Sequence, residues 1–254
     1  MMADSTPLHL LQITDTHLFA DPEGRLHGIN TRYTLQTVLA AARLRPPPDL
    51  VLLTGDLVHD GSPAGYRALT AMLPQLAVPV ACIAGNHDAY PGFRILADSG
   101  LRVGGTQTLG NWRIVLLNTQ MPGSDGGHLQ ARELRLLSEA LAQSPEPHIL
   151  VALHHHPLPM GSAWLDHIAL DNADDFFAAL DASDKVRGVI WGHVHQLHES
   201  QRRGVRLLGT PSSCIQFRPG SRDFALDTRP PAMRWLTLHG DGGIDTRVEW
   251  VAQA

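Results

Sequence analysis

Short apolar runs that recur along the chain constrain its fold more than any other feature of the sequence. Each run is only a few residues long and is bounded by polar residues, glycine or proline. Runs of this kind are typical of β-strands that are buried on both faces. The sequence contains six of them, at Leu8–Ile13, Leu50–Leu53, Val78–Ala84, Ile114–Leu117, Ile149–Leu153 and Val186–Trp191.

Segments with helical periodicity separate these runs. Each one repeats apolar residues three or four positions apart, which places them on one helical face and predicts a helix. The second segment begins with Ser62 and Pro63, a typical N-cap followed by proline in the first turn. The four apolar stripes are Leu35/Val38/Leu39/Ala42, Tyr66/Leu69/Leu73, Leu134/Leu137/Leu141 and Phe176/Phe177/Leu180.

The last part of the chain has a different pattern. After about residue 204 the helical periodicity stops, while short runs at Val205–Leu208, Trp235–Leu238 and Val248–Val251 predict further strands. Strands that alternate with helices, followed by such runs, predict an α/β fold with antiparallel additions near its end. The sequence contains no linker, and Pro46–Pro48 forms a turn between a predicted helix and a strand. We therefore expect residues 1–254 to form a single domain.

Composition narrows the possible partners and the compartment. A net charge of -5 argues against a broad nucleic-acid or anionic-membrane surface. The first residues lack the basic start and apolar stretch of a secretory signal. The longest aliphatic run, Ile149–Leu153, is far shorter than the ~20 residues that span a bilayer. We expect a cytoplasmic protein whose two cysteines, Cys82 and Cys214, are buried thiols without a metal or redox spacing. The sequence specifies no oligomeric state.

A polar cluster follows five of the apolar runs. In open α/β sheets, the loops beyond the carboxyl ends of the strands bind ligands, so we expect these clusters to form a site. Taken singly, each cluster could equally be a turn or a chance group of polar surface residues. The occurrence of all five after buried strands favours a functional site. The clusters are Thr14-Asp15-Thr16-His17, Thr54-Gly55-Asp56, Gly85-Asn86-His87-Asp88, His154-His155-His156-Pro157 and Gly192-His193-Val194-His195.

The side chains in these clusters are typical ligands of divalent metals. Carboxylates, imidazoles and an amide oxygen suit borderline and hard ions, and iron, manganese and zinc all fit this set. No cysteine takes part, which disfavours a structural zinc site. Seven ligands are too many for one zinc and suit two metals that share a carboxylate. Two metals about 3.5–4 Å apart can activate a hydroxide and clamp both oxygens of an in-line phosphoryl displacement.

The ordered clusters resemble the calcineurin-like metallophosphoesterases, whose pattern is Asp-x-His, Gly-Asp, Gly-Asn-His-Asp/Glu, a strand-ending His and Gly-His-x-His. All five blocks are present between Asp15 and His195. The resemblance implies a four-layer α/β/β/α sandwich with two mixed central sheets. It also implies two divalent metal ions with a shared ligand. One would be held by Asp15, His17, Asp56 and His195, and the other by Asp56, Asn86, His154 and His193.

The resemblance implies further roles for residues in the same clusters. His87 would protonate or stabilise the leaving group, and Asp88 would orient it. His154 is expected as the metal ligand of the histidine triplet because it directly follows the strand, whereas His155 would face the substrate and His156 would be structural. The substrate would contact His17, Asp56, Asn86, His87, His155 and His195.

A narrower resemblance covers nearly the whole chain. Gly55–Ser62 and the segments around His154–Asp166, Asn172 and Thr210–Phe217 are similar to class III cyclic nucleotide phosphodiesterases, in particular to bacterial enzymes that act on 3',5'-cyclic AMP. This implies hydrolysis of cyclic AMP to 5'-AMP, which would lower a cyclic nucleotide signal. His59 departs from the polar residue expected in its block. The candidates for contact with the base are Trp164, His167 and Asn172, and packing within the loop accounts equally well for Trp164 and His167.

Other functions compete with this hypothesis. The metal blocks alone also suit an enzyme that acts on a glycerophosphodiester, a 2',3'-cyclic nucleotide or a phosphomonoester. A nuclease is disfavoured, because the acidic charge balance provides no basic groove. A scaffold or metal store without catalysis would retain the fold, but it would leave Asn86 and His87 without a role.

Overall fold

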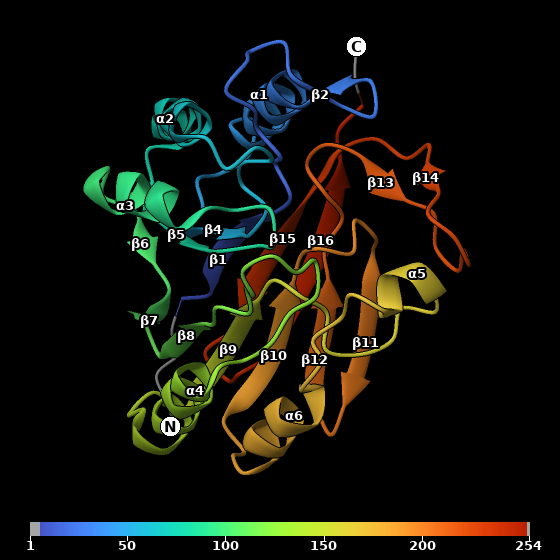
Figure 1. The fold of residues 1–254 in the computed structure, drawn as a ribbon. Helices are drawn as coiled ribbons and strands as arrows, with labels where there is room; N and C mark the ends of the chain where they lie inside the picture. The colour runs from blue at the N-terminus through green and yellow to red at the C-terminus, as the bar shows by residue number, and fades with distance from the viewer. Residues whose placement is uncertain (1–5, 253–254) are drawn as a thin grey trace.

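The computed structural model of this protein, which describes residues 6–252, consists of two six-stranded mixed sheets packed face to face (Figure 1). The first sheet has the order β16-β15-β1-β4-β5-β6, and the second β11-β12-β10-β9-β8-β7. The first contains β1 (Leu8–Ile13), β4 (Leu50–Thr54), β5 (Val80–Ile83), β6 (Arg102–Val103), β15 (Ala232–Leu238) and β16 (Ile244–Trp250). The second contains β7 (Gly105–Leu109), β8 (Trp112–Leu116), β9 (His148–Leu153), β10 (Val186–Trp191), β11 (His198–Arg202) and β12 (Val205–Gly209).

Helices cover the outer faces of both sheets, which confirms the predicted four-layer α/β/β/α class (Figure 1). On the first sheet lie α1 (Thr31–Ala42), α2 (Pro63–Met72), the 3₁₀ turn η1 (Leu73–Leu76) and α3 (Tyr90–Asp98). On the second lie α4 (Ala131–Gln143) and α6 (Ala173–Asp181). The remaining elements are the short helix α5 (Ala163–Asp166) and two hairpins, β2 (Arg25–Leu26) with β3 (Ile29–Asn30) and β13 (Gln216–Phe217) with β14 (Leu226–Asp227).

The burial of each sheet between two layers explains the uninterrupted apolar runs. Successive side chains of a strand point to opposite faces. In β4, Val51 and Leu53 pack against the helices, while Leu50 and Leu52 enter the core between the sheets. Strand β9 divides its side chains in the same way between the outer core and the core between the sheets. All six predicted strands are present, and β1, β4, β5 and β8, β9, β10 pair in parallel within each sheet.

Local signals in the sequence also correspond to observed features. Ser62 caps α2 by accepting a hydrogen bond from the Gly65 N–H at 3.1 Å, and Pro63 is the first residue of that helix. The late runs form β12, β15 and β16, and both cysteines are buried. Within residues 6–252, none of the helices is both long and apolar enough to cross a membrane.

A buried arginine links the two sheets at their C-terminal strands. Arg234 on β15 is fully buried and donates to Glu199 Oε1 on β11 at 2.7 Å and to the Gly209 carbonyl on β12 at 3.0 Å. Its Nε also donates to Thr210 Oγ1 at 2.9 Å. Because a buried charge is tolerated only when it is paired and hydrogen-bonded, these contacts fix how the two sheets lie against each other.

We expect Leu52→Ala to lower the free energy of unfolding of the metal-free protein by about 2–5 kcal/mol, since it opens a cavity between the sheets. Urea denaturation followed by circular dichroism measures this change. Leu44→Ala is the matched control, because Leu44 is 85% exposed and its removal leaves no cavity. Equal stability of the two variants would contradict the packing of the sheets described above.

Candidate metal centre

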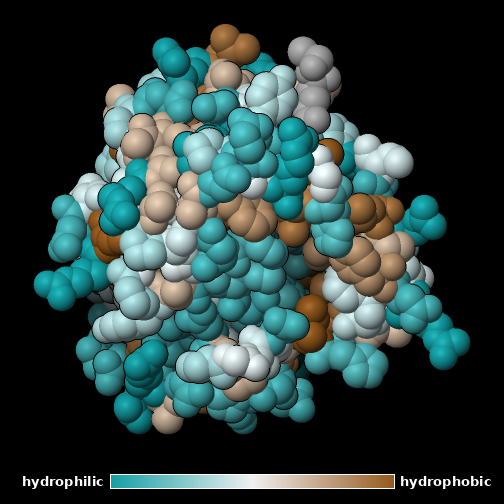
Figure 2. Space-filling view, turned by 45° about the horizontal axis from the view of Figure 1, so that its top comes forward, coloured by the Kyte–Doolittle hydropathy of each residue, from teal (hydrophilic) through white to brown (hydrophobic). Residues whose placement is uncertain are grey.

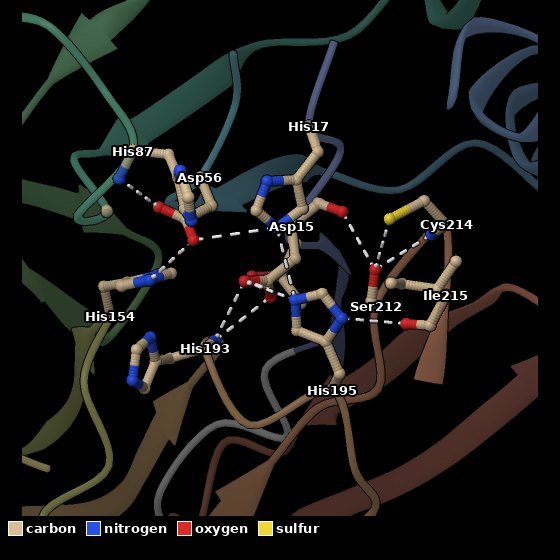
Figure 3. A network of polar contacts seen from close by, with 12 residues as sticks. Asp15, His17, Asp56, His87, His154, His193, His195, Ser212, Cys214 and Ile215 are labelled. Carbon is tan, nitrogen blue, oxygen red and sulfur yellow. Dashed lines mark hydrogen bonds and ion pairs between the residues drawn. The ribbon is translucent and has the colours of Figure 1, made fainter. Parts of the chain in front are cut away.

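The five polar clusters converge where the carboxyl ends of the central strands of both sheets meet (Figure 3). Side chains from the loops after β1, β4, β5, β9 and β10 point toward one another across the junction between the sheets. Their ligand atoms form overlapping groups within 4.8 Å, which include Asp15/His17/His195 and Asp15/Asp56/His154. The predicted convergence of these loops is therefore present in the fold.

Asp56 lies between two sets of ligands. Its Oδ2 atom is 3.7 Å from His17 Nε2 on one side and 3.5 Å from His154 Nε2 on the other. Its Oδ1 atom accepts a hydrogen bond from the His87 N–H at 2.9 Å, which fixes the plane of the carboxylate. One oxygen of Asp56 is thus placed to be shared by two cations.

The first set consists of Asp15, His17 and His195 together with Asp56. His195 Nε2 lies 3.3 Å from both His17 Nε2 and Asp15 Oδ1. His195 Nδ1 is 2.8 Å from the Ile215 carbonyl and donates to it, so its Nε2 presents a lone pair to the centre. Two imidazole nitrogens and a carboxylate oxygen at these distances suit a cation bound between them.

The second set places Asn86 between two histidines. Asn86 Oδ1 is 3.2 Å from His154 Nε2 and 3.0 Å from His193 Nδ1. The other ring nitrogens of the two histidines donate to backbone carbonyls, His154 Nδ1 to Thr54 at 2.8 Å and His193 Nε2 to Ile168 at 3.1 Å. These bonds fix the tautomers that present lone pairs to the centre, an arrangement that protein metal sites commonly use.

The charges of these groups also fit bound cations. Burial lowers the pKa of His17 and His193 well below the usual value, which keeps both imidazoles neutral and able to coordinate. Burial opposes ionisation of Asp56, yet His154 and His17 hold the pKa of its carboxyl well below the usual range. Burial likewise disfavours a charged His154, but the Asp56 carboxylate outweighs it and raises the pKa of that imidazole to about 9. His154 therefore carries a proton beside Asp56 when no metal is bound, and it would release this proton on coordination. A buried carboxylate at this position requires a positive charge beside it.

The backbone is strained at the ligand positions. Five of the predicted ligands have left-handed φ angles, which non-glycine residues adopt at a cost and mostly at functional sites. They are Asp15 (54°), His17 (44°), Asp56 (51°), His193 (65°) and His195 (45°). A Cβ atom on Gly85 would lie only 2.2 Å from Asp56 Oδ1 and 2.3 Å from Asp56 N. Glycine is therefore required there for the loop after β5 to approach Asp56.

His87 occupies the position expected of a group that acts on the substrate. Its half-buried ring lines the same cavity as His17, Asp56 and Asn86. Asp88 was predicted to orient His87, but its carboxylate makes other contacts. The Asp88 carboxylate accepts hydrogen bonds from the N–H groups of Leu57, Val58 and Gly85 and from the Tyr66 hydroxyl. Asp88 therefore positions the loops after β4 and β5 and does not hold the ring.

The histidine triplet divides into three environments. His154 directs Nε2 toward Asp56 and Asn86. His155 is fully buried, with Nδ1 2.7 Å from Thr119 Oγ1 and Nε2 3.2 Å from the Asp125 carbonyl. The expectation that it faces the substrate does not agree with this geometry, because both ring nitrogens bond to the protein behind the ligands. His156 is also buried and stacks on His193 at 5.6 Å, consistent with a structural role.

The candidates for base contact also divide. Trp164 lines the cavity. Asn172 instead joins backbone atoms, accepting from the Leu129 N–H and donating to the Leu129 carbonyl. His167 is exposed, and its Nδ1 donates to the Ala163 carbonyl within its own turn of helix. Neither Asn172 nor His167 lines the cavity.

His59 is a residue of the site that the sequence reasoning set aside. Its Nδ1 lies 3.2 Å from His17 Nδ1, and its ring stacks on His87 with centroids 4.5 Å apart at 23°. For His17 to coordinate through Nε2, its Nδ1 must carry the proton, and this Nδ1–H then donates a hydrogen bond to His59 Nδ1. Burial lowers the pKa of His59, which favours the neutral acceptor form. In the sequence, the position of His59 three residues after Asp56 was the one feature that indicated its proximity to the site.

The fold and the site define a metallophosphoesterase, and comparison with known proteins agrees with this class. Residues 8–197 match the family described as calcineurin-like phosphoesterase. The chain belongs to this family. Among solved structures, a dimetal phosphatase from Danio rerio superposes with a TM-score of 0.65 at 15% identity, covering 97% of this chain and all of that one. A purple acid phosphatase from yellow lupin gives a TM-score of 0.65 at 14% identity, covering 96% of this chain and 54% of that one. Both likenesses concern the fold.

Several curated relatives are similar over nearly the full length of the chain. The 3',5'-cyclic adenosine monophosphate phosphodiesterase CpdA of Pseudomonas aeruginosa is 41% identical, with 95% of this chain and 89% of the relative covered. The protein of the same name from Escherichia coli strain K12 is 40% identical, with 99% and 92% covered. A 3',5'-cyclic-nucleotide phosphodiesterase of Nostoc is 38% identical, with 98% and 95% covered.

We expect His59→Ala to weaken metal binding about 10- to 100-fold, the usual effect of removing a partner that orients a ligating histidine. Titration of metal-free protein with Mn²⁺, followed by calorimetry, measures the affinity directly. His239→Ala, in the turn between β15 and β16, is the control and should bind as the wild type does. An unchanged affinity in His59→Ala would refute the orienting contact with His17.

Proposed function

We propose that this protein hydrolyses 3',5'-cyclic AMP to 5'-AMP with two divalent metal ions and thereby lowers a cyclic nucleotide signal. The substrate follows from relatives named for this activity, which are about 40% identical over nearly the whole chain. The chemistry follows from the complete donor set on both sides of Asp56. The observation that carries the proposal is the position of Asp56 Oδ2 between His17 and His154.

The residues present fit two metal ions. Asp15, His17, Asp56 and His195 would hold one, and Asp56, Asn86, His154 and His193 the other. Nitrogen and oxygen donors of this kind accept iron, manganese or zinc. When bound, such ions polarise phosphate oxygens and lower the pKa of water so that a nucleophile forms near neutral pH.

The remaining steps belong to side chains at the cavity. His87 is the group that donates a proton to the departing 3'-oxygen, a role suited to an imidazole near neutral pH. Its place is fixed by the bond from its N–H to Asp56 Oδ1 and by the stacked ring of His59. Asn86 directs Oδ1 toward His154 and His193, which leaves its amide N–H₂ to donate to a phosphate oxygen as charge develops.

The substrate assignment is tested by a panel of phosphate esters. Protein loaded with manganese or iron is assayed with cyclic AMP, cyclic GMP, 2',3'-cyclic AMP, a glycerophosphodiester and bis(p-nitrophenyl) phosphate. We expect preferred turnover of cyclic AMP to 5'-AMP. Chelation should abolish all turnover, because the metal ions would polarise the phosphate and generate the nucleophile. Turnover of the generic diester alone would support the metal centre and contradict the assignment of cyclic AMP as the substrate.

The assignment of His87 is tested separately from metal binding. We expect His87→Ala to retain two metals per chain while its turnover of cyclic AMP falls about 10²- to 10⁴-fold, the usual contribution of a general acid. Elemental analysis and the rate are measured on the same sample. Asp56→Ala is the contrasting variant and should lose metal together with activity. A fully active His87→Ala protein would rule out the proposed proton donor.

A further inference from the structure

The cavity at the metal centre has a second wall that the hydrolysis of a phosphate ester does not require. The cavity has a volume of about 240 Å³, and five of the proposed ligands line it, namely His17, Asp56, Asn86, His193 and His195. Its remaining lining is largely apolar and rich in rings. We call His27, Trp164, Phe217 and Phe224 the aromatic wall. These residues come from the β2–β3 hairpin, from α5 and from the β13–β14 hairpin with its loop, segments distant in sequence from the ligand clusters.

The rings of the aromatic wall form a continuous surface that begins at a metal ligand. Phe217 stacks on His195, with centroids 4.0 Å apart and the ring planes within 8°. Trp164 meets Phe217 edge-on at 5.0 Å and Phe224 edge-on at 5.2 Å. His27 stacks on Phe224 at 5.1 Å and completes the wall from the opposite hairpin. The wall thus extends outward from the position expected for the phosphate.

Phe224 is 46% exposed and lines the cavity, so its ring is accessible to a ligand there. In Figure 2, hydrophobic residues border the hydrophilic centre of the face turned forward. The polar atom of Trp164 is already satisfied, because its Nε1 donates to Ser221 Oγ at 3.3 Å. The backbone of Trp164 also bonds to the Arg222 carbonyl, which fixes α5 against the β13–β14 loop. Ring contact is therefore the main interaction that this wall offers.

We propose that the aromatic wall is the subsite for the base of the nucleotide, which binds there by ring contact while the phosphate lies at the metal centre. The inference rests on the proposed cyclic nucleotide substrate and extends it by naming the residues that distinguish a nucleotide from a simple diester. Aromatic side chains suit this task, since every base has a π-face on which a ring can stack.

The test compares two substrates that share the reacting ring. Cyclic AMP and methyl riboside 3',5'-cyclic phosphate contain the same cyclic phosphodiester, and only the first carries a base. We expect Phe224→Ala to lower the ratio of their kcat/KM values roughly tenfold, mainly through a higher KM for cyclic AMP, as loss of one base-stacking ring does elsewhere. Phe224→Tyr keeps the ring and should keep the ratio. Tyr33→Ala is the matched control, because Tyr33 is 47% exposed and lies on α1 outside the cavity.

Binding of the product gives an independent measurement. In metal-loaded protein, calorimetry should show that Phe224→Ala weakens binding of 5'-AMP roughly tenfold relative to ribose 5-phosphate, which lacks the base. An unchanged ratio in both experiments, with wild-type protein active on cyclic AMP, would overturn the subsite and leave the proposed function standing. Wild-type protein that turns over generic diesters but not cyclic AMP would overturn both. Circular dichroism shows whether each variant is folded.

Discussion

The buried carboxylate of Asp56 is the constraint on which the rest of this structure depends. It is 2% exposed at the junction of two sheets, where an unpaired negative charge is prohibitively costly. The imidazoles of His17 and His154 flank it, with Nε2 atoms 3.7 Å and 3.5 Å from Asp56 Oδ2, and the carboxylate favours positive charge on both sides. Strained ligand residues and the close approach of Gly85 follow from bringing several loops to this one oxygen.

Because the proposed ligands come from both sheets, the site exists only when the sheets are packed together. The core between them holds Leu52 and Leu150 in contact with the same apolar cluster, and Arg234 links their C-terminal strands. Metal binding should therefore stabilise the packed form, since the ligands are not assembled in the unfolded chain. The helices on the outer faces complete the burial but supply none of the ligands.

Much of this arrangement follows from sequence patterns that are local. Strands buried on both faces produce apolar runs such as Leu50–Leu53, and parallel pairing of β1 with β4 brings the residues that follow them, such as Asp15 and Asp56, to one edge of their sheet. Other features depend on contacts between distant segments. The Asp88 carboxylate bonds to the loop after β4, His155 turns toward Thr119, and His59 reaches His17. The short hairpins that carry His27 and Phe224 have too few residues for a periodic signal.

The most direct test of the central claim is a crystal structure of manganese-loaded protein measured at the manganese absorption edge. The account predicts two anomalous peaks about 3.5–4 Å apart, the usual separation in dimetal hydrolases, on either side of Asp56 Oδ2. One should lie against Asp15, His17 and His195, and the other against Asn86, His154 and His193. A single peak, or two peaks that do not share Asp56, would contradict the account.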